Sequence, residues 1–175
     1  MLVETEISEL LKKADFDEAF KLIVSSQKKA IYIHIYRMLG NHADTDDALQ
    51  ETFIRVWRHL EKFKGDSKLS TWVYRIATNV ALTQLEKEKK RKTIPLTNVE
   101  VAISEGLAPT SVEILQKLET AMERLPSRQK QVFIMRYYDE LSYQDIADIT
   151  GTSEGALKAS YHHAVKKIEA FLQAN

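Results

Sequence analysis

Cysteine is absent from this chain of 175 residues, and glycine and proline are rare, with 5 and 3 occurrences. The lack of cysteine excludes disulfides, thiolate zinc sites and cysteine nucleophiles. No apolar run approaches the roughly 20 residues of a membrane-spanning helix, so we expect no membrane insertion. The opening segment MLVETEISEL lacks the basic and then apolar layout of a signal peptide. These absences predict a soluble, cytoplasmic protein.

An excess of charge is also missing, because 25 basic residues balance 25 acidic ones. The whole-chain charge therefore gives no indication of a nucleic-acid partner. Residues 1–92 hold 17 basic and 14 acidic residues, residues 93–111 hold none and 2, and residues 112–175 hold 8 and 9. Basic residues therefore exceed acidic ones only in residues 1–92.

Hydrophobic residues make up 44% of the chain, which is enough for a core, and they recur mostly at helical spacing. The pattern predicts an all-α protein. Helix-breaking residues mark the expected ends of the helices. Gly40 ends a helical run that starts near Asp17, and Gly65 lies in a polar gap. Residues 93–111 contain Pro95, Gly106 and Pro109 and show weak periodicity. We expect this stretch to be a flexible linker between two small helical domains, residues 1–92 and 112–175.

Two further helices are predicted in the first domain. One spans about 43–62, and its apolar stripe is Ala48, Leu49, Thr52, Phe53, Val56, Trp57 and Leu60. The other runs from an N-cap at Ser70 or Thr71 to about Arg91. One arc of this helix is apolar and consists of Trp72, Val73, Ile76, Ala77 and Val80. A second arc forms a polar face that we expect to point away from the core, and it consists of Arg75, Thr78, Asn79 and Leu82.

The second domain has helix-turn-helix spacing. Ser142 is placed to cap the short helix YQDIADI, residues 150–153 form a tight turn, and a second helix runs from Glu154 toward Phe171. The apolar residues expected to lock the two helices are Ile146, Ala147, Ile149, Leu157, Val165 and Ile168. The side chains left for solvent or DNA are Thr152, Ser153, Lys158, Ser160, His162, His163, Lys166 and Lys167. Spacing alone also permits an ordinary helical hairpin with a solvated basic face.

Other candidate sites are weaker. The acidic group Asp44, Asp46, Asp47 and Glu51 lacks the glycine and the glutamate spacing of a calcium loop, so we interpret it as a helix N-terminus and partner surface. Lys62, Lys64 and Lys68 lie around Gly65 just before Trp72, a combination suited to unpaired DNA but equally compatible with a solvated loop. The histidines lack metal-site spacing, and no phosphate-binding glycine loop or nucleophile elbow occurs. We expect no metal, no cofactor and no catalytic site.

Three blocks occur together in order: ALQETFIRVWRHLEKF, KLSTWVYRIATNVAL and MERLPSRQKQVFIMRYYDELSYQDIADITGTSEGALKASYHHAVKKIEAFL. Over about residues 17–92 and 112–172 the chain resembles the sigma-70 family of bacterial RNA polymerase sigma factors, in particular the extracytoplasmic-function (ECF) group. The resemblance implies that residues 1–92 are a region 2 domain, which binds core polymerase and reads and melts the −10 promoter element. Residues 112–175 would be a region 4 domain, whose helix-turn-helix reads the −35 element.

The resemblance also implies roles for individual residues. The positions that match the polymerase-binding helix are Asp47, Gln50, Glu51, Phe53, Arg55 and Trp57. The loop 62–71, with Lys62, Lys64 and Lys68, matches the strand-opening segment, and Arg75, Asn79 and Leu82 match the −10 reading helix. The implied partners are core RNA polymerase, promoter DNA and an anti-sigma factor, and the free protein is expected to be a monomer.

Two departures from the family bear on DNA binding. Thr83, Glu86 and Glu88 stand where the family often has an aspartate and then a run of arginines. In the recognition helix, the family's common arginines are replaced by Ser160, His163 and Val165. The promoter sequence therefore does not transfer from relatives.

Two other functions were weighed against this one. A stand-alone helix-turn-helix regulator would bind an operator as a dimer, but it gains little from a linker of 19 residues and leaves the acidic helix without a role. A helical enzyme is disfavoured because no convergent acid, base or metal set is present.

Overall fold

The computed structural model describes residues 2–91 and 109–174, and every regular element in these ranges is a helix. The chain divides into two compact units, one built of α1–α4 and the other of α5–α8, which we treat separately. The prediction of an all-α protein made of two helical units is confirmed. Of the predicted linker, 93–108 lies outside the described residues, whereas 109–111 are already helical. None of the described helices combines the length and the apolar character needed to cross a membrane.

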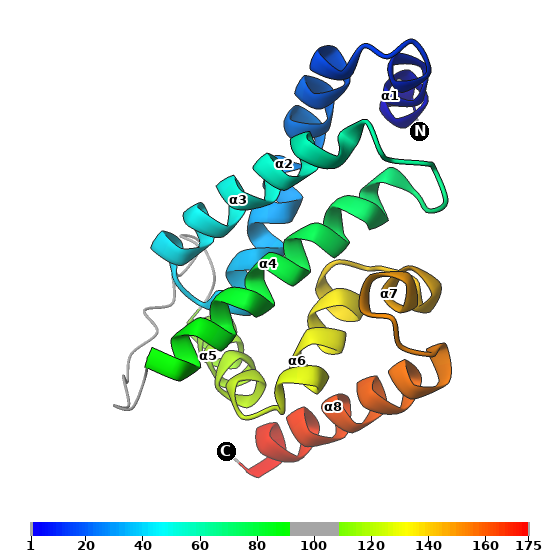
Figure 1. Cartoon of the computed structure of the whole chain (residues 1–175). Coiled ribbons are helices and arrows are strands. Elements are labelled where there is room, and N and C mark those ends of the chain that lie inside the picture. The colour runs from blue at the N-terminus through cyan, green and yellow to red at the C-terminus, as the bar shows by residue number, and fades with distance from the viewer. Residues whose placement is uncertain (1, 92–108, 175) are drawn as a thin grey trace. The chain divides into compact units, whose positions relative to one another are not determined.

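In the first unit, α2 (Phe16–Leu39), α3 (His42–Leu60) and α4 (Leu69–Arg91) all pack against one another (Figure 1). The short helix α1 (Leu2–Lys12) packs on α2 and buries Ile7, and the sequence patterns did not predict this helix. The core is formed by the facing apolar stripes of α2, α3 and α4. The predicted helix 43–62 corresponds to α3, within two residues at each end.

The corner between α2 and α3 follows from two residues. Gly40 adopts a left-handed conformation, with φ of +80°, and its N–H donates to the Tyr36 carbonyl at 2.7 Å. A glycine has no Cβ to oppose this conformation, so it ends the helix as the sequence predicted. Asn41 then caps α3 by accepting a 2.9 Å hydrogen bond from the Asp44 N–H.

The N-terminus of α4 differs from the prediction. Neither Ser70 nor Thr71 is the N-cap, because α4 begins at Leu69 and the Trp72 N–H bonds to the Lys68 carbonyl at 3.0 Å. Leu69 is only 8% exposed and Thr71 only 2%, so burial draws both residues into the first helical turn. A capping residue would instead lie just before the first turn and accept a hydrogen bond there from a backbone N–H.

The predicted polar face of α4 also needs one correction. Val73, Ala77 and Val80 are buried as expected, but Thr78 is 1% exposed and does not face solvent. Its Oγ1 lies 3.0 Å from Nε2 of His34 on α2, inside the core. The sequence could not show this, because a threonine at the edge of an apolar arc is compatible with either environment until a buried partner is known.

The second unit contains α5 (Pro109–Glu123), α6 (Ser127–Phe133), a π-helical turn η1 (Ile134–Tyr138), α7 (Tyr143–Thr150) and α8 (Glu154–Ala174). Both α5 and α6 pack on α8. Ser142 caps α7 by accepting from the Asp145 N–H at 3.0 Å, and Gly151, with φ of +66°, ends it. The predicted helix-turn-helix is confirmed, and of the six residues expected to lock its helices, Ile146, Ile149, Leu157 and Ile168 are buried, whereas Ala147 and Val165 are only half-buried.

Candidate polymerase and DNA interfaces

Helix α3 has one buried and one exposed apolar face. Val56 and Leu60 are 0% and 1% exposed and belong to the core. On the other side, Ile54 is 38% exposed and Trp57 is 44% exposed. Large exposed apolar side chains that lie within one helical turn of each other are typical of a protein-binding surface.

The exposed ring of Trp57 packs against an aromatic side chain of α2. The ring of Phe20 on α2 meets Trp57 edge to face at 5.2 Å and meets Phe53 at 6.4 Å. Phe53, predicted at the polymerase-binding surface, is only 9% exposed. Its contribution to such a surface is therefore indirect, through the Phe20 ring that packs on both Phe53 and Trp57. Asp47 and Gln50 are exposed, as the sequence predicted.

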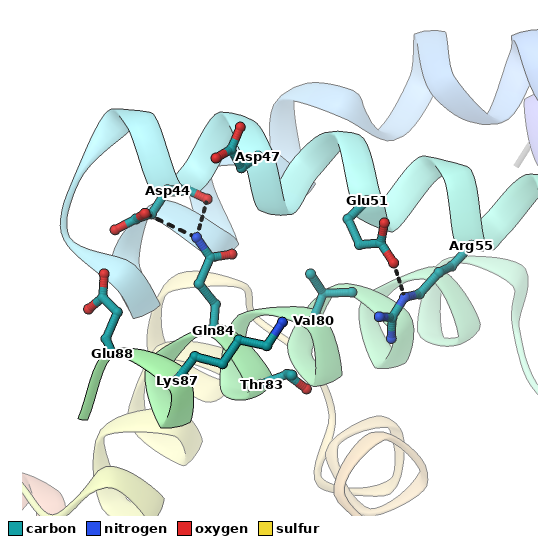
Figure 2. Close-up of a pocket in the computed structure, with 9 residues that line it drawn as sticks. All are labelled: Asp44, Asp47, Glu51, Arg55, Val80, Thr83, Gln84, Lys87 and Glu88. Carbon is teal, nitrogen blue, oxygen red and sulfur yellow. Dashed lines mark hydrogen bonds and ion pairs between the residues drawn. The ribbon is translucent and has the colours of Figure 1, made fainter. Parts of the chain in front are cut away.

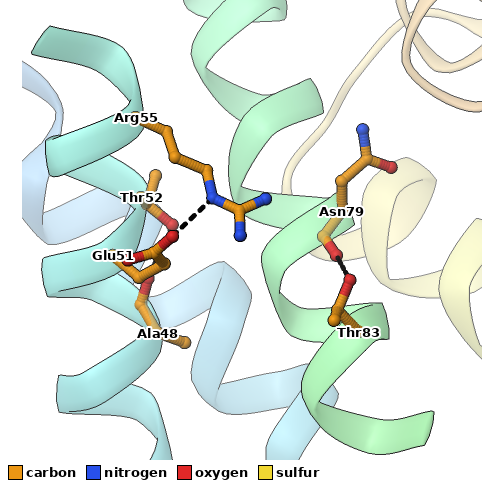
Figure 3. Close-up of polar contacts among 6 residues, drawn as sticks. All are labelled: Ala48, Glu51, Thr52, Arg55, Asn79 and Thr83. Carbon is orange, nitrogen blue, oxygen red and sulfur yellow. Dashed lines mark hydrogen bonds and ion pairs between the residues drawn. The ribbon is translucent and has the colours of Figure 1, made fainter. Parts of the chain in front are cut away.

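Glu51 and Arg55 form an ion pair, with Oε1 and Nε 2.6 Å apart at i, i+4 (Figure 3). Both side chains are 42% exposed, so the pair contributes little to stability. The charges of Glu51 and Arg55, both matched to the polymerase-binding helix, are therefore paired with each other within α3.

A groove runs between α3 and α4 and has mixed charge (Figure 2). Its lining residues are Asp44, Asp47, Glu51, Arg55, Val80, Thr83, Gln84, Lys87 and Glu88. Gln84 Nε2 donates to the Asp44 carboxylate at 3.1 Å and lies 3.3 Å from the Asp44 carbonyl, so α4 is tied to the start of α3. Within the described ranges, no cluster of three or more acids and histidines is arranged to hold a metal ion.

The predicted −10 residues of α4 differ in exposure. Asn79 is exposed, whereas Arg75 and Leu82 are half-buried. The Thr83 hydroxyl donates to the Asn79 backbone carbonyl at 2.8 Å and does not engage its amide side chain (Figure 3). Arg75 Nε is buried and has no hydrogen-bond partner among the described residues. A buried donor of this kind normally finds a partner, and in this position an added ligand could supply one.

The loop before α4 presents its lysines outward. Lys62, Lys64 and Lys68 are all exposed. The loop is anchored by Phe63, whose ring packs on Trp72 at 5.1 Å, and it turns at Gly65 with φ of +78°. The result is a basic loop fixed to a helix by an aromatic pair.

In the second unit, most of the predicted DNA-binding side chains reach solvent. Ser153, His162, His163, Lys166 and Lys167 are exposed, and Thr152 and Ser160 are half-buried. Lys158 is also exposed, but its ammonium group interacts with two neighbouring side chains. Its Nζ lies 3.4 Å from Glu154 and 5.5 Å from the centre of the Tyr143 ring. A base contact by Lys158 would therefore compete with these two interactions.

The sequence patterns missed Arg128. This exposed residue, in the first turn of α6, donates a 3.0 Å hydrogen bond to Oγ1 of Thr152 in the turn between α7 and α8. The two residues lie 24 positions apart, and no periodicity connects them. Only the tertiary structure shows that Arg128 adjoins the helix-turn-helix, in addition to Lys158, Lys166 and Lys167.

The family described as sigma-70 region 2 matches residues 23–91, and the family described as sigma-70, region 4 matches residues 115–168. The ECF RNA polymerase sigma factor SigW of Bacillus subtilis is 33% identical over 174 residues, covering 93% of this chain and 92% of that protein. The ECF RNA polymerase sigma-E factor of Escherichia coli K12 is 28% identical over 186 residues, covering 98% and 95%.

Two solved structures share the fold. The sigma factor RpoE of Bartonella quintana, in complex with the anti-sigma factor NepR, superposes with a TM-score of 0.73 at 22% identity, covering 89% of this chain and 98% of that one. CnrH in complex with the cytosolic domain of CnrY gives a TM-score of 0.71 at 18% identity, covering 99% and 97%. At these identities the likeness concerns the fold.

Proposed function

Since the chain belongs to the extracytoplasmic-function group of the sigma-70 family, and is thus a sigma factor that directs RNA polymerase to promoters, we propose how its residues divide that work. The region 2 match spans α2–α4, and the region 4 match spans α5–α8 apart from the ends. Each matched region therefore corresponds to one of the two helical units. This correspondence supports one function for each unit: polymerase binding and −10 recognition in the first, and −35 recognition in the second.

Core polymerase binds the exposed face of α3 in this proposal. The observation that supports it is Trp57, which remains 44% exposed although its ring packs edge to face on Phe20. An exposed tryptophan with polar neighbours such as Asp47 and Gln50 matches the anchor residues that dominate protein interfaces. Glu51 and Arg55, already paired, present both charges on the same face.

The −10 element is read by α4 and opened with the help of the loop before it. The exposed amide of Asn79 has both a donor and an acceptor for a base edge. Arg75 has an unsatisfied Nε, and Leu82 supplies an apolar contact beside them. Lys62, Lys64 and Lys68 would neutralise phosphates of the separated strand.

The −35 element is read by α8. Its N-terminal half enters the major groove and presents Ser160, His162 and His163, with Ser153 in the turn just before the helix and Lys166 and Lys167 toward phosphate. Thr152, held by Arg128, and Lys158, held by Glu154 and Tyr143, are less free to read bases and more suited to fixing the approach of the helix.

The protein acts without a catalytic site of its own, because the polymerase performs the chemistry, and it acts in the cytoplasm, where polymerase and chromosome are found. We also propose an anti-sigma factor as its inhibitory partner, since the sigma factor RpoE of Bartonella quintana, which has the same fold, was solved in complex with such a protein. Free of partners it is a monomer. A protein that binds the chain and is displaced by core polymerase would meet this description.

Run-off transcription tests the function directly. Core polymerase is supplied with promoter fragments randomised in both elements, with and without the purified chain. Specific transcripts that appear only with the chain, and that share two elements at a constant spacing, support the proposal. The absence of such transcripts, with core polymerase that another sigma factor activates, would overturn it.

Duplex binding distinguishes a sigma factor from a stand-alone regulator, which neither the fold nor the comparisons favour. With 25 basic and 25 acidic residues, the free chain neutralises few phosphates, so we expect weak binding to duplex promoter DNA. A sequence-specific nanomolar complex of the free chain at physiological salt would contradict this.

A further inference from the structure

A buried polar pair joins α4 to α2 beneath the residues proposed to face the −10 element. Nε2 of His34 and Oγ1 of Thr78 are 3.0 Å apart, and the two residues are 0% and 1% exposed. The ring of Tyr74 meets His34 edge to face at 5.1 Å. Polar groups in a core are costly unless they are hydrogen-bonded. The pair therefore favours the packing of α4 on α2 in which this bond is made.

The fully buried apolar side chains in the middle of α4 are short, so they constrain the rotation of the helix less than long side chains would. From residue 73 to residue 81, its buried apolar residues are small: Val73, Ala77, Val80 and Ala81. Short side chains form shallow ridges, so a small rotation about the helix axis displaces little packed volume. A hydrogen bond, in contrast, weakens steeply when its angle departs from the preferred range. The His34–Thr78 contact is thus a directional interaction in the middle of α4.

The rotation of α4 determines where its DNA-facing side chains lie. Thr78 immediately precedes Asn79 and follows Arg75 by three positions, so the three residues span about 100° of the helix circumference. A rotation of about 10° moves a side-chain tip, at about 5–6 Å from the axis, by about 1 Å. A displacement of that size is enough to lose a hydrogen bond to a base edge.

A second anchor lies further along the same helix. Gln84 donates to the Asp44 carboxylate at 3.1 Å, which ties the C-terminal half of α4 to the start of α3 (Figure 2). Asn79 and Leu82 lie between this anchor and Thr78 in sequence. Asn79 and Leu82 are therefore bracketed by two polar contacts to two different helices, and Arg75 lies one turn before the first of them.

We propose that the His34–Thr78 pair is a positioning element for −10 recognition: it sets the rotation of α4 and thereby the placement of Asn79 and Arg75 against the bases. His34 and Thr78 themselves touch no DNA. This inference rests on the proposed function of α4 as the −10 reader. It predicts that the pair controls which −10 sequences are preferred, in addition to stability.

The test compares full-length variants in transcription with core polymerase over a promoter library randomised across the −10 element. Thr78→Val breaks the bond and leaves the His34 nitrogen buried without it. The double variant His34→Leu/Thr78→Val replaces both partners by apolar groups of similar size, a change that is often nearly neutral for stability. Thr78→Ser retains the hydroxyl, and Asn79→Ala reports on the reading face itself. Thermal unfolding is measured for every variant.

We expect Thr78→Val to lower Tm by about 5 °C or more and the double variant to recover most of that loss. Both should alter the relative yield of at least one −10 sequence by about threefold or more, whereas Thr78→Ser should keep the wild-type ranking. A ranking of −35 sequences, measured in parallel, should not change in any of them.

A stable double variant with the wild-type −10 ranking would overturn the inference, because the pair would then be purely structural. If the double variant does not fold, Thr78→Val assayed well below its Tm gives the same decision. Asn79→Ala distinguishes the positioning role of the His34–Thr78 pair from the −10 reading role of α4. A changed ranking with Asn79→Ala but not with the pair variants overturns the positioning role alone, whereas no change with any variant overturns the proposed role of α4 as well.

Discussion

The guanidinium of Arg128, at the start of α6, donates a 3.0 Å hydrogen bond to the Thr152 hydroxyl in the turn of the helix-turn-helix. The contact places an exposed cation beside the turn that precedes the recognition helix α8. Phosphate contacts in helix-turn-helix proteins come from such flanking positions. Arg128 therefore extends the basic surface that the sequence patterns located only on α8.

Replacement of Arg128 by alanine should reduce transcription to a similar extent across −35 variants, because a phosphate contact carries no sequence information. The salt dependence of promoter binding by the holoenzyme should fall by about one unit of slope. Lys28→Ala, which removes an exposed cation from α2, serves as the control and should change neither quantity. A shift in the preferred −35 sequence with Arg128→Ala would contradict the phosphate assignment.

Replacement of His162 by alanine should relax the −35 preference at one base pair, at a cost of about 1–3 kcal/mol there, because this exposed side chain lies in the N-terminal half of α8. Lys167→Ala, more than a turn further along, should instead lower activity evenly. Both are measured by transcription over randomised −35 sequences. An unchanged sequence ranking with His162→Ala, combined with a normal fold, would remove His162 from the reading face.

Replacement of Trp57 by alanine should weaken binding to core polymerase by about 10-fold or more, the scale expected for a buried aromatic anchor. Asp47→Lys should weaken it as well by reversing a charge on the same face. Asp17→Lys makes the same charge change on a different helix, in the first turn of α2. Competition with a labelled sigma factor for core polymerase gives the affinities, and equal affinities for all three variants would exclude α3 as the docking helix.

Replacement of Lys130 by methionine should stabilise the second unit at neutral pH by up to about 1 kcal/mol. Burial lowers the pKa of Lys130 below its ordinary value of 10.5, and Glu123 opposes this effect only in part. The folded state therefore binds this proton less readily than the unfolded state, and the wild type gains stability as pH rises through the folded pKa.

The difference in unfolding free energy between Lys130→Met and the wild type should accordingly be largest at neutral pH and should decrease as the pH approaches 10.5. Urea unfolding at a series of pH values measures it. Lys166→Met, at an exposed position of α8, is the control and should show no such trend. A Lys130→Met variant that is less stable at every pH would show that the ammonium group makes a favourable interaction in the fold.

Local chemistry determined a large part of this structure. Gly40 and Gly151 end helices because only a residue without a Cβ enters the left-handed region freely, and Asn41 and Ser142 cap helices through their own side chains. Helical periodicity likewise located α3, α4 and the helix-turn-helix. These signals are carried by neighbouring residues, so they can be read along the chain.

Tertiary packing decided the remaining features, because they depend on residues that are distant in sequence. Thr78 turns into the core since His34, 44 positions earlier, supplies a buried partner. Arg128 contacts the helix-turn-helix because α6 packs on α8. Phe53 is buried and Trp57 stays exposed, although the ring of Phe20 on another helix contacts both. A one-dimensional pattern shows which face of a helix is apolar, but the identity of the side chain opposite each position is determined only when the helices pack.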